Sequence, residues 1–157
     1  MIPKNHETAL REITTTLESA DITWAITGSV NFALQGLPVE PNDIDIQTDR
    51  QGAYAFEDMF SSALVDPVSF TENDHIRSHF GRFRIAGIEV EVMGDIEKRR
   101  DGEWIGPIHL PEYIENITYA DMKLPVLALS YEYTAYKKLG RDERANLIKE
   151  HLENREN

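Results

Sequence analysis

Two aspartates separated by one residue, Asp43 and Asp45, are the side chains of this sequence best suited to chemistry. They lie in the segment Asn42-Asp43-Ile44-Asp45-Ile46, in which acidic and apolar residues alternate. Alternate side chains of an extended strand point to opposite faces, so the two carboxylates share one face and the two isoleucines point into a core. Two carboxylates on one face of a rigid strand suit a divalent cation with oxygen ligands, and Mg²⁺ is the usual case.

A Gly28-Ser29 pair precedes this segment, with Asp43 fourteen residues after Ser29. The pair ends an apolar run and opens a short helical pattern, which Ser29 could cap. Backbone N–H groups at such a point can hold a phosphate. Together with the two aspartates, the pair predicts a site for a metal ion and a phosphate.

A third carboxylate is expected from an adjacent strand, because two metal ions that clamp both oxygens of an in-line displacement need further anionic ligands. Glu89 and Glu91 are the carboxylates in a strongly strand-like run. Glu91 lies deeper in that run, between Val90 and Val92, so it is the preferred third acid and Glu89 the second choice. The alternative is that both glutamates only form surface ion pairs with arginines, which contribute about 0–1 kcal/mol.

Composition narrows the class of protein. The chain has 157 residues, 41% of them hydrophobic, and no Cys, which fits one domain (residues 1–157) without disulfides or a thiol nucleophile. No leader-like or membrane-spanning apolar run is present, so a soluble, cytoplasmic protein is the expectation, with no membrane partner. The net charge of −12 argues against long nucleic acid as a partner but allows a small anion such as a nucleoside triphosphate.

Hydrophobic periodicity and turn residues indicate alternating helices and strands. The pattern predicts an α/β or α+β domain with a mixed sheet. Helices are expected at residues 5–19, 29–35, 51–64, 130–139 and 142–152, strands at 22–27 and 43–47, a hairpin at 79–93, a loop at 101–104 and a last hairpin at 114–124.

The hairpin around Ala86-Gly87 has a defined register. If these two residues form the turn, Ile85 faces Ile88 and Phe83 faces Val90, so the apolar pairs share one face. Arg84 then faces Glu89 and Arg82 faces Glu91 on the other face. A shift by one residue would destroy this segregation.

These motifs resemble the DNA polymerase β-type nucleotidyltransferase superfamily. The resemblance rests on Gly28-Ser29, Asn42-Asp43-Ile44-Asp45-Ile46 and Val90-Glu91-Val92-Met93. Length and layout are most similar to its small single-domain members, including lincosamide and aminoglycoside nucleotidyltransferases. The resemblance covers residues 20–95 well and the C-terminal hairpin and helices, about 112–153, loosely. It implies a nucleotidyltransferase fold: a short mixed β-sheet backed by helices, with further C-terminal helices.

The resemblance also implies roles for these residues. Gly28 and Ser29 would hold the β- and γ-phosphates of the nucleotide. Asp43 and Asp45 would bind two Mg²⁺ ions, which Mn²⁺ could replace. Glu91 would complete the metal shell or take the proton of the acceptor hydroxyl. The third acid of this superfamily is often Asp, so Glu91 is a departure by one methylene.

Basic residues near the phosphates come from two places. Arg82 and Arg84 share the charged face of the hairpin with Glu89 and Glu91. Lys137 and Lys138 resemble a helical Lys region that contacts nucleotide in relatives. Neighbouring residues of a helix point in different directions, so at most one of the two lysines faces the site, and spacing does not choose between them. Favourable contact with the helix dipole is the simpler explanation of both.

Two hypotheses follow for function. The first is a Mg²⁺-dependent nucleotidyltransferase that moves a nucleoside monophosphate, AMP by expectation, from its triphosphate to a hydroxyl of an unidentified acceptor. The second is a catalytically inactive relative that acts as a nucleotide sensor or as a protein-binding partner of the toxin–antitoxin type. The acceptor pocket of so short a chain is expected to be built by the C-terminal helices or by a second subunit in a homodimer.

Overall fold

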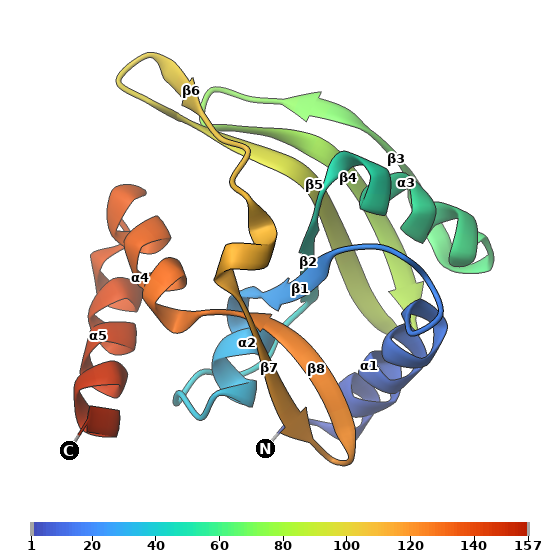
Figure 1. The fold of residues 1–157 in the computed structure, drawn as a ribbon, viewed down its shortest axis with the longest axis horizontal. Helices are drawn as coiled ribbons and strands as arrows, with labels where there is room; N and C mark the ends of the chain where they lie inside the picture. Colours follow the sequence, from blue (N-terminus) through green and yellow to red (C-terminus); the bar gives the residue numbers. More distant parts are fainter. Residues whose placement is uncertain (1, 157) are drawn as a thin grey trace.

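Helices and strands alternate along the chain as the periodicity predicts (Figure 1). The computed structural model describes residues 2–156. Its helices are α1 Lys4–Leu17, α2 Gly28–Leu34, α3 Arg50–Met59, α4 Leu129–Lys138 and α5 Asp142–Glu156, with 3-10 turns at Ser61–Ala63 (η1) and Leu110–Tyr113 (η2). Its strands are β1 Trp24–Thr27, β2 Ile44–Thr48, β3 Leu64–Glu72, β4 Ile76–Ile85, β5 Ile88–Arg100, β6 Glu103–Ile105, β7 Ile114–Tyr119 and β8 Met122–Leu127.

The described strands form one mixed sheet, which confirms the predicted fold class. The strand order is β3-β4-β5-β2-β1-β8-β7, and β6 pairs with β5. Most neighbours are antiparallel, whereas β2 with β5 and β1 with β8 are parallel. The parallel pairing of β2 and β5 matters most, because it places the two strands that carry the predicted acids side by side.

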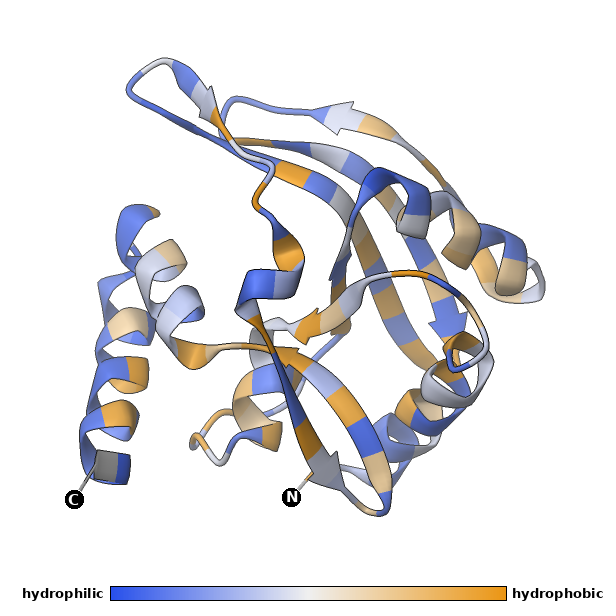
Figure 2. Cartoon of the chain, in the orientation of Figure 1, coloured by the Kyte–Doolittle hydropathy of each residue, from blue (hydrophilic) through white to orange (hydrophobic). Residues whose placement is uncertain are grey.

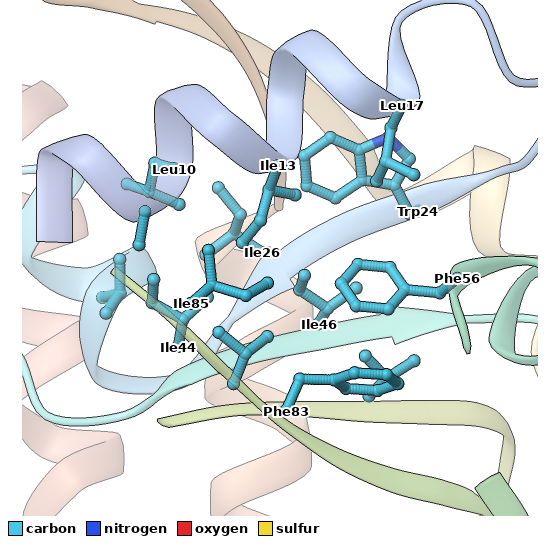
Figure 3. Packing of buried hydrophobic residues seen from close by; sticks show 14 of the residues in the cluster. Leu10, Ile13, Leu17, Trp24, Ile26, Ile44, Ile46, Phe56, Phe83 and Ile85 are labelled. Atoms are coloured by element: carbon cyan, nitrogen blue, oxygen red, sulfur yellow. The ribbon is translucent and has the colours of Figure 1, made fainter. Parts of the chain in front are cut away.

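The main core lies between α1, α3 and one face of this sheet. Leu10, Ile13 and Leu17 recur at helical spacing in α1 and are buried. Figure 3 shows them pointing toward the isoleucines and Phe83 of the strands and toward Phe56 of α3. Burial of these side chains orients the central strands, so their alternate residues must point to the opposite face.

The hairpin of β4 and β5 has the predicted register. Ile85 pairs with Ile88 and Phe83 with Val90, and their side chains face the core. Arg82 pairs with Glu91 on the opposite face. Hydrophilic and hydrophobic residues alternate visibly along both strands in Figure 2. One face of the hairpin is therefore packed and the other is charged.

Three details differ from the sequence-based expectations. Strand β3 was not predicted, because Val68 is its one buried residue and no apolar alternation marks it. Residues 101–104 form a turn and the start of β6 rather than a loop. The expectation that Ser29 caps α2 is wrong: the N-cap residue is Thr27, and Ser29 lies inside the first turn. Among the described residues no helix combines the length and apolar character that crossing a bilayer requires.

Candidate functional site

The predicted acids meet on the charged face of the two parallel central strands. Asp45 of β2 is paired directly with Glu91 of β5, and their carboxyl groups lie within hydrogen-bonding reach. Asp43 lies immediately before β2 on the same face. One carboxylate oxygen from each of Asp43, Glu89 and Glu91 lies within 4.8 Å of the other two. Four acidic side chains from two strands therefore share one small area of the sheet.

Asp45 lies at the side of this cluster next to the start of α2. A Cβ atom added to Gly28 would come within 2.5 Å of Asp45 Oδ2. Gly28 also has a φ of +74°, which side-chain-bearing residues rarely adopt. Both features require glycine at this position, because its absent side chain lets the backbone of α2 approach the carboxylate.

Without a bound cation, the surroundings of Asp45 disfavour the charged form of its carboxyl group. Burial, followed by the neighbouring carboxylates of Glu91, Asp43 and Glu132, raises the pKa of Asp45 from 3.8 to about 8. Each of these causes disfavours the charged form. A bound cation would act in the opposite direction and hold the carboxyl group deprotonated.

This pKa shift predicts that Asp45→Asn stabilises the metal-free protein at high pH. In the wild-type protein, the folded state keeps the proton of Asp45 between about pH 4 and about pH 8, whereas the unfolded chain loses it over this interval. The free energy of unfolding therefore falls as the pH rises from about 4 to about 8. Asparagine removes this penalty, which we expect to be about 1–3 kcal/mol at pH 9, or roughly 3–8 °C in melting temperature.

The measurement is thermal unfolding of both proteins in chelator at pH 5 and pH 9. The gain in melting temperature should be present at pH 9 and small at pH 5, where the wild-type carboxyl group is neutral in the folded state. An equal difference at the two pH values would contradict the electrostatic cause.

The two glutamates of β5 differ in their partners. Arg82 Nη2 lies 3.3 Å from Glu89 Oε1, and Arg82 Nε lies 3.1 Å from Asp66 Oδ2 of β3. Arg82 thus neutralises Glu89, although its register partner is Glu91. Among the described residues Glu91 forms no ion pair. Arg84 is exposed near the turn. The ion-pair explanation therefore applies to Glu89, whereas Glu91 lies beside Asp45 without a cationic partner among the described residues.

Glu132 of α4 is a buried acid that sequence reasoning missed. Its carboxylate accepts hydrogen bonds from Thr27 Oγ1 (2.7 Å), Gly28 N (3.1 Å) and Asn31 Nδ2 (3.2 Å). Burial raises its pKa, although these three donors act in the other direction. Glu132 joins the C-terminal helices to the first turn of α2, and it adds negative potential at Asp45. Nothing in the sequence around Glu132 predicts that it is buried, because it is a single Glu in a helix of ordinary composition.

The backbone just before Asp43 is held on both sides. Ser29 Oγ accepts a hydrogen bond of 2.9 Å from Asn42 N. His6 Nε2 of α1 lies 2.6 Å from Asn42 O. A carbonyl can only accept, so His6 must carry its proton on Nε2 in this contact. These two contacts position the aspartate, and the Ser29 hydroxyl remains able to donate its own hydrogen.

The two candidate lysines of α4 have different surroundings. Lys137 Nζ donates to Tyr133 Oη at 3.2 Å and lies over that ring. Lys138 lines a pocket between α4 and the last part of β5, where it lies near Lys98. The structure thus separates two residues that spacing could not, and it brings Lys138 toward the pocket. Lys98 is a further cation that sequence reasoning did not select.

The donor set suits a hard divalent cation. Asp43, Asp45 and Glu91 offer carboxylate oxygens from rigid strands, which are ligands for Mg²⁺ or Mn²⁺. The carboxylate oxygens that lie within 4.8 Å of one another belong to Asp43, Glu89 and Glu91, and Asp45 is not among them. The carboxyl group of Asp45 nevertheless contacts that of Glu91. A cation between them would relieve the repulsion that raises the pKa of Asp45.

Comparison with known proteins identifies similar nucleotidyltransferases. A family model described as aminoglycoside-2''-adenylyltransferase matches residues 9–153. The crystal structure of a suspected nucleotidyltransferase from Thermotoga maritima is 46% identical in sequence, with a TM-score of 0.87 over 98% of this chain and 96% of that one. No curated protein matched the chain.

Two antibiotic-modifying enzymes share the fold at low identity. The lincomycin-bound lincosamide antibiotic adenylyltransferase LnuA is 15% identical, with a TM-score of 0.53 over 83% of each chain. ANT(2'')-Ia in complex with adenylyl-2''-tobramycin is 12% identical, with a TM-score of 0.59 over 95% of this chain and 90% of that one. At this identity the similarity shows a common fold alone.

Proposed function

This chain belongs to the aminoglycoside-2''-adenylyltransferase family of nucleotidyltransferases, and from that premise we propose that it transfers AMP from ATP to a hydroxyl group of a small-molecule acceptor. The relatives named for adenylyl transfer motivate the choice of ATP as donor. Dependence on Mg²⁺, the acceptor and the roles of individual residues are part of this proposal.

The meeting of Asp43, Asp45 and Glu91 on one face of β2 and β5 carries the proposal. Nucleotidyl transfer needs little covalent help from a protein, which must instead position the reactants and neutralise charge. Unpaired carboxylates in contact destabilise a fold unless something compensates them. Their presence together on two adjacent strands supports a site built for a cation.

The reaction would join the acceptor oxygen to the α-phosphorus and break the bond to the β-phosphate, so that pyrophosphate leaves. Bound Mg²⁺ would neutralise the phosphate oxygens and stabilise the charge that develops on the attacking and leaving oxygens. Asp43 and Asp45 would hold the ions. Glu91, as the acid without a cationic side-chain partner, would be the third ligand or would accept the hydroxyl proton.

Gly28 and Ser29 are proposed to contact the terminal phosphates. Gly28 N already donates to Glu132, so the Ser29 hydroxyl and the N–H groups beyond it would make the contact. Neither lysine of α4 is assigned to these phosphates, because Lys137 contacts Tyr133 and Lys138 lies in the pocket beside the end of β5.

Calorimetric titration with a non-hydrolysable ATP analogue tests the proposal. With Mg²⁺ we expect saturable binding with a dissociation constant below about 1 mM, and no binding in chelator. The Asp58→Asn variant, which changes an exposed aspartate of α3, should bind like wild type. Absence of binding at millimolar analogue and Mg²⁺ would contradict the proposed function.

A further inference from the structure

A bulge in β5 places the basic residue Lys98 on the same face as the acids. Between Arg77 and His79, β4 advances two residues, whereas β5 advances three, from Gly94 to Glu97. The extra residue lies beside Asp95, whose φ is +49°. An inserted residue reverses the alternation of the strand beyond it. Lys98 therefore points to the face that carries Glu91, although regular alternation would place it on the other.

A pocket opens beside Lys98. It has a volume of about 130 Å³ and lies between the end of β5, the segment before η2 and α4. Its apolar walls are formed by Ile96, Ile105, Ile108, Tyr131, Ala135 and Leu139. Ile105 and Leu139 are 54% and 42% exposed. Large apolar side chains exposed around a concave, mostly apolar surface are typical of ligand sites.

The charged groups of this pocket are cations. Lys98 is half-buried, its ammonium lies 5.9 Å from the centre of the Tyr131 ring, and Lys138 lies on the opposite wall. Burial lowers the pKa of Lys98, as does the nearby Lys138, whereas the carboxylate of Glu132 acts in the other direction. Neither lysine forms an ion pair within the part of the chain that the structure describes. Two ammonium groups near one another on apolar walls favour a ligand that brings negative charge.

The pocket is within the length of a small molecule from the acids. Tyr131, which lines it, lies beside Gln47 of β2. Gln47 lies two residues after Asp45 on the same face of the strand, about 7 Å along it. Glu132, the next residue of α4, contacts Gly28. A molecule seated between the lysines can therefore extend a hydroxyl toward the carboxylates.

We propose that this pocket binds the acceptor, and that the acceptor is a small organic anion with an apolar or aromatic body. The carboxylate, sulfonate or phosphate group of the acceptor contacts Lys98 and Lys138, and its body packs on Tyr131 and the isoleucines. A polyamine such as tobramycin would bring further cations to these lysines, so it is not the acceptor. This inference rests on the proposed function, and it specifies the chemical class of the acceptor.

The test uses the fluorescent anion 8-anilinonaphthalene-1-sulfonate and its uncharged analogue N-phenyl-1-naphthylamine, with the full chain. We expect saturable binding of the anion, weakened roughly tenfold by Lys98→Met or Lys138→Met and retained by Lys98→Arg. Lys149→Met, a change at an exposed lysine of α5, should have no effect. Binding of the uncharged analogue should be equal in all variants, and circular dichroism checks folding.

Two competitors complete the experiment. The Mg²⁺ complex of a non-hydrolysable ATP analogue should leave the anion bound, and millimolar tobramycin should neither displace it nor raise the melting temperature. Anion binding that is unchanged in Lys98→Met and Lys138→Met, or that is lost when the nucleotide binds, would overturn the inference. These results are independent of the nucleotide calorimetry, whose failure would instead contradict the proposed function.

Discussion

Replacement of Asp45 by Asn is expected to lower the rate of nucleotidyl transfer by at least about 10³-fold while the protein stays folded. Asparagine has nearly the shape of aspartate, so it fits beside Gly28 without a new clash. It lacks the negative charge that a divalent cation requires from its ligands. The variant should therefore lose metal-dependent chemistry, even though it is more stable than wild type in chelator at high pH.

Transfer can be followed without knowing the acceptor. Incubation with a metabolite extract and ATP labelled at the α-phosphate should produce a labelled adduct with wild type and with the Asp58→Asn control. Asp43→Asn should behave like Asp45→Asn, because the two aspartates share one face. Undiminished labelling by the Asp45 variant would remove this residue from the catalytic site.

Glu91→Gln is expected to reduce transfer by about 10²–10³-fold, whereas Glu89→Gln should reduce it less than about tenfold. The two residues lie on the same strand, on the same face and near the same aspartates. They differ because Arg82 contacts Glu89 and leaves Glu91 unpaired. Removal of Glu89 therefore disrupts a partly exposed ion pair, whereas removal of Glu91 takes away the acid that contacts Asp45.

Measurement of both variants in the same labelling assay isolates the third acid. Melting temperatures measured in parallel would separate loss of chemistry from loss of folding. A larger loss for Glu89→Gln than for Glu91→Gln would reverse the assignment. Glu89 would then be the third ligand, with Arg82 as a positioning residue.

Local patterns were sufficient to predict the strands that carry the acids. Alternation of acids with Ile44 and Ile46 fixes which face of β2 is charged, since the isoleucines must be buried. The Ala86-Gly87 turn and the apolar pairs beside it set the register of β4 and β5, which the structure confirms. These features depend on neighbours in sequence, so a single chain suffices to infer them.

Long-range contacts could not be inferred in the same way. Glu132 is buried because α4 packs on α2, a contact between residues about one hundred positions apart. Lys98 faces the site because of a bulge whose residues have no turn signature. Strand β3 is an edge strand with Val68 alone buried, so its pattern resembles that of a loop. In each case tertiary packing determines the structure, and the local sequence gives no indication of it.

The central claim is that Asp43, Asp45 and Glu91 hold one divalent cation, and the anomalous scattering of Mn²⁺ tests it most directly. The measurement is a crystal structure of the protein grown with Mn²⁺ and a non-hydrolysable ATP analogue. We predict an anomalous peak coordinated by carboxylate oxygens of all three residues and by the nucleotide. A peak bound by Asp43 and Glu89 without Asp45, or the absence of any peak near these strands, would contradict the claim.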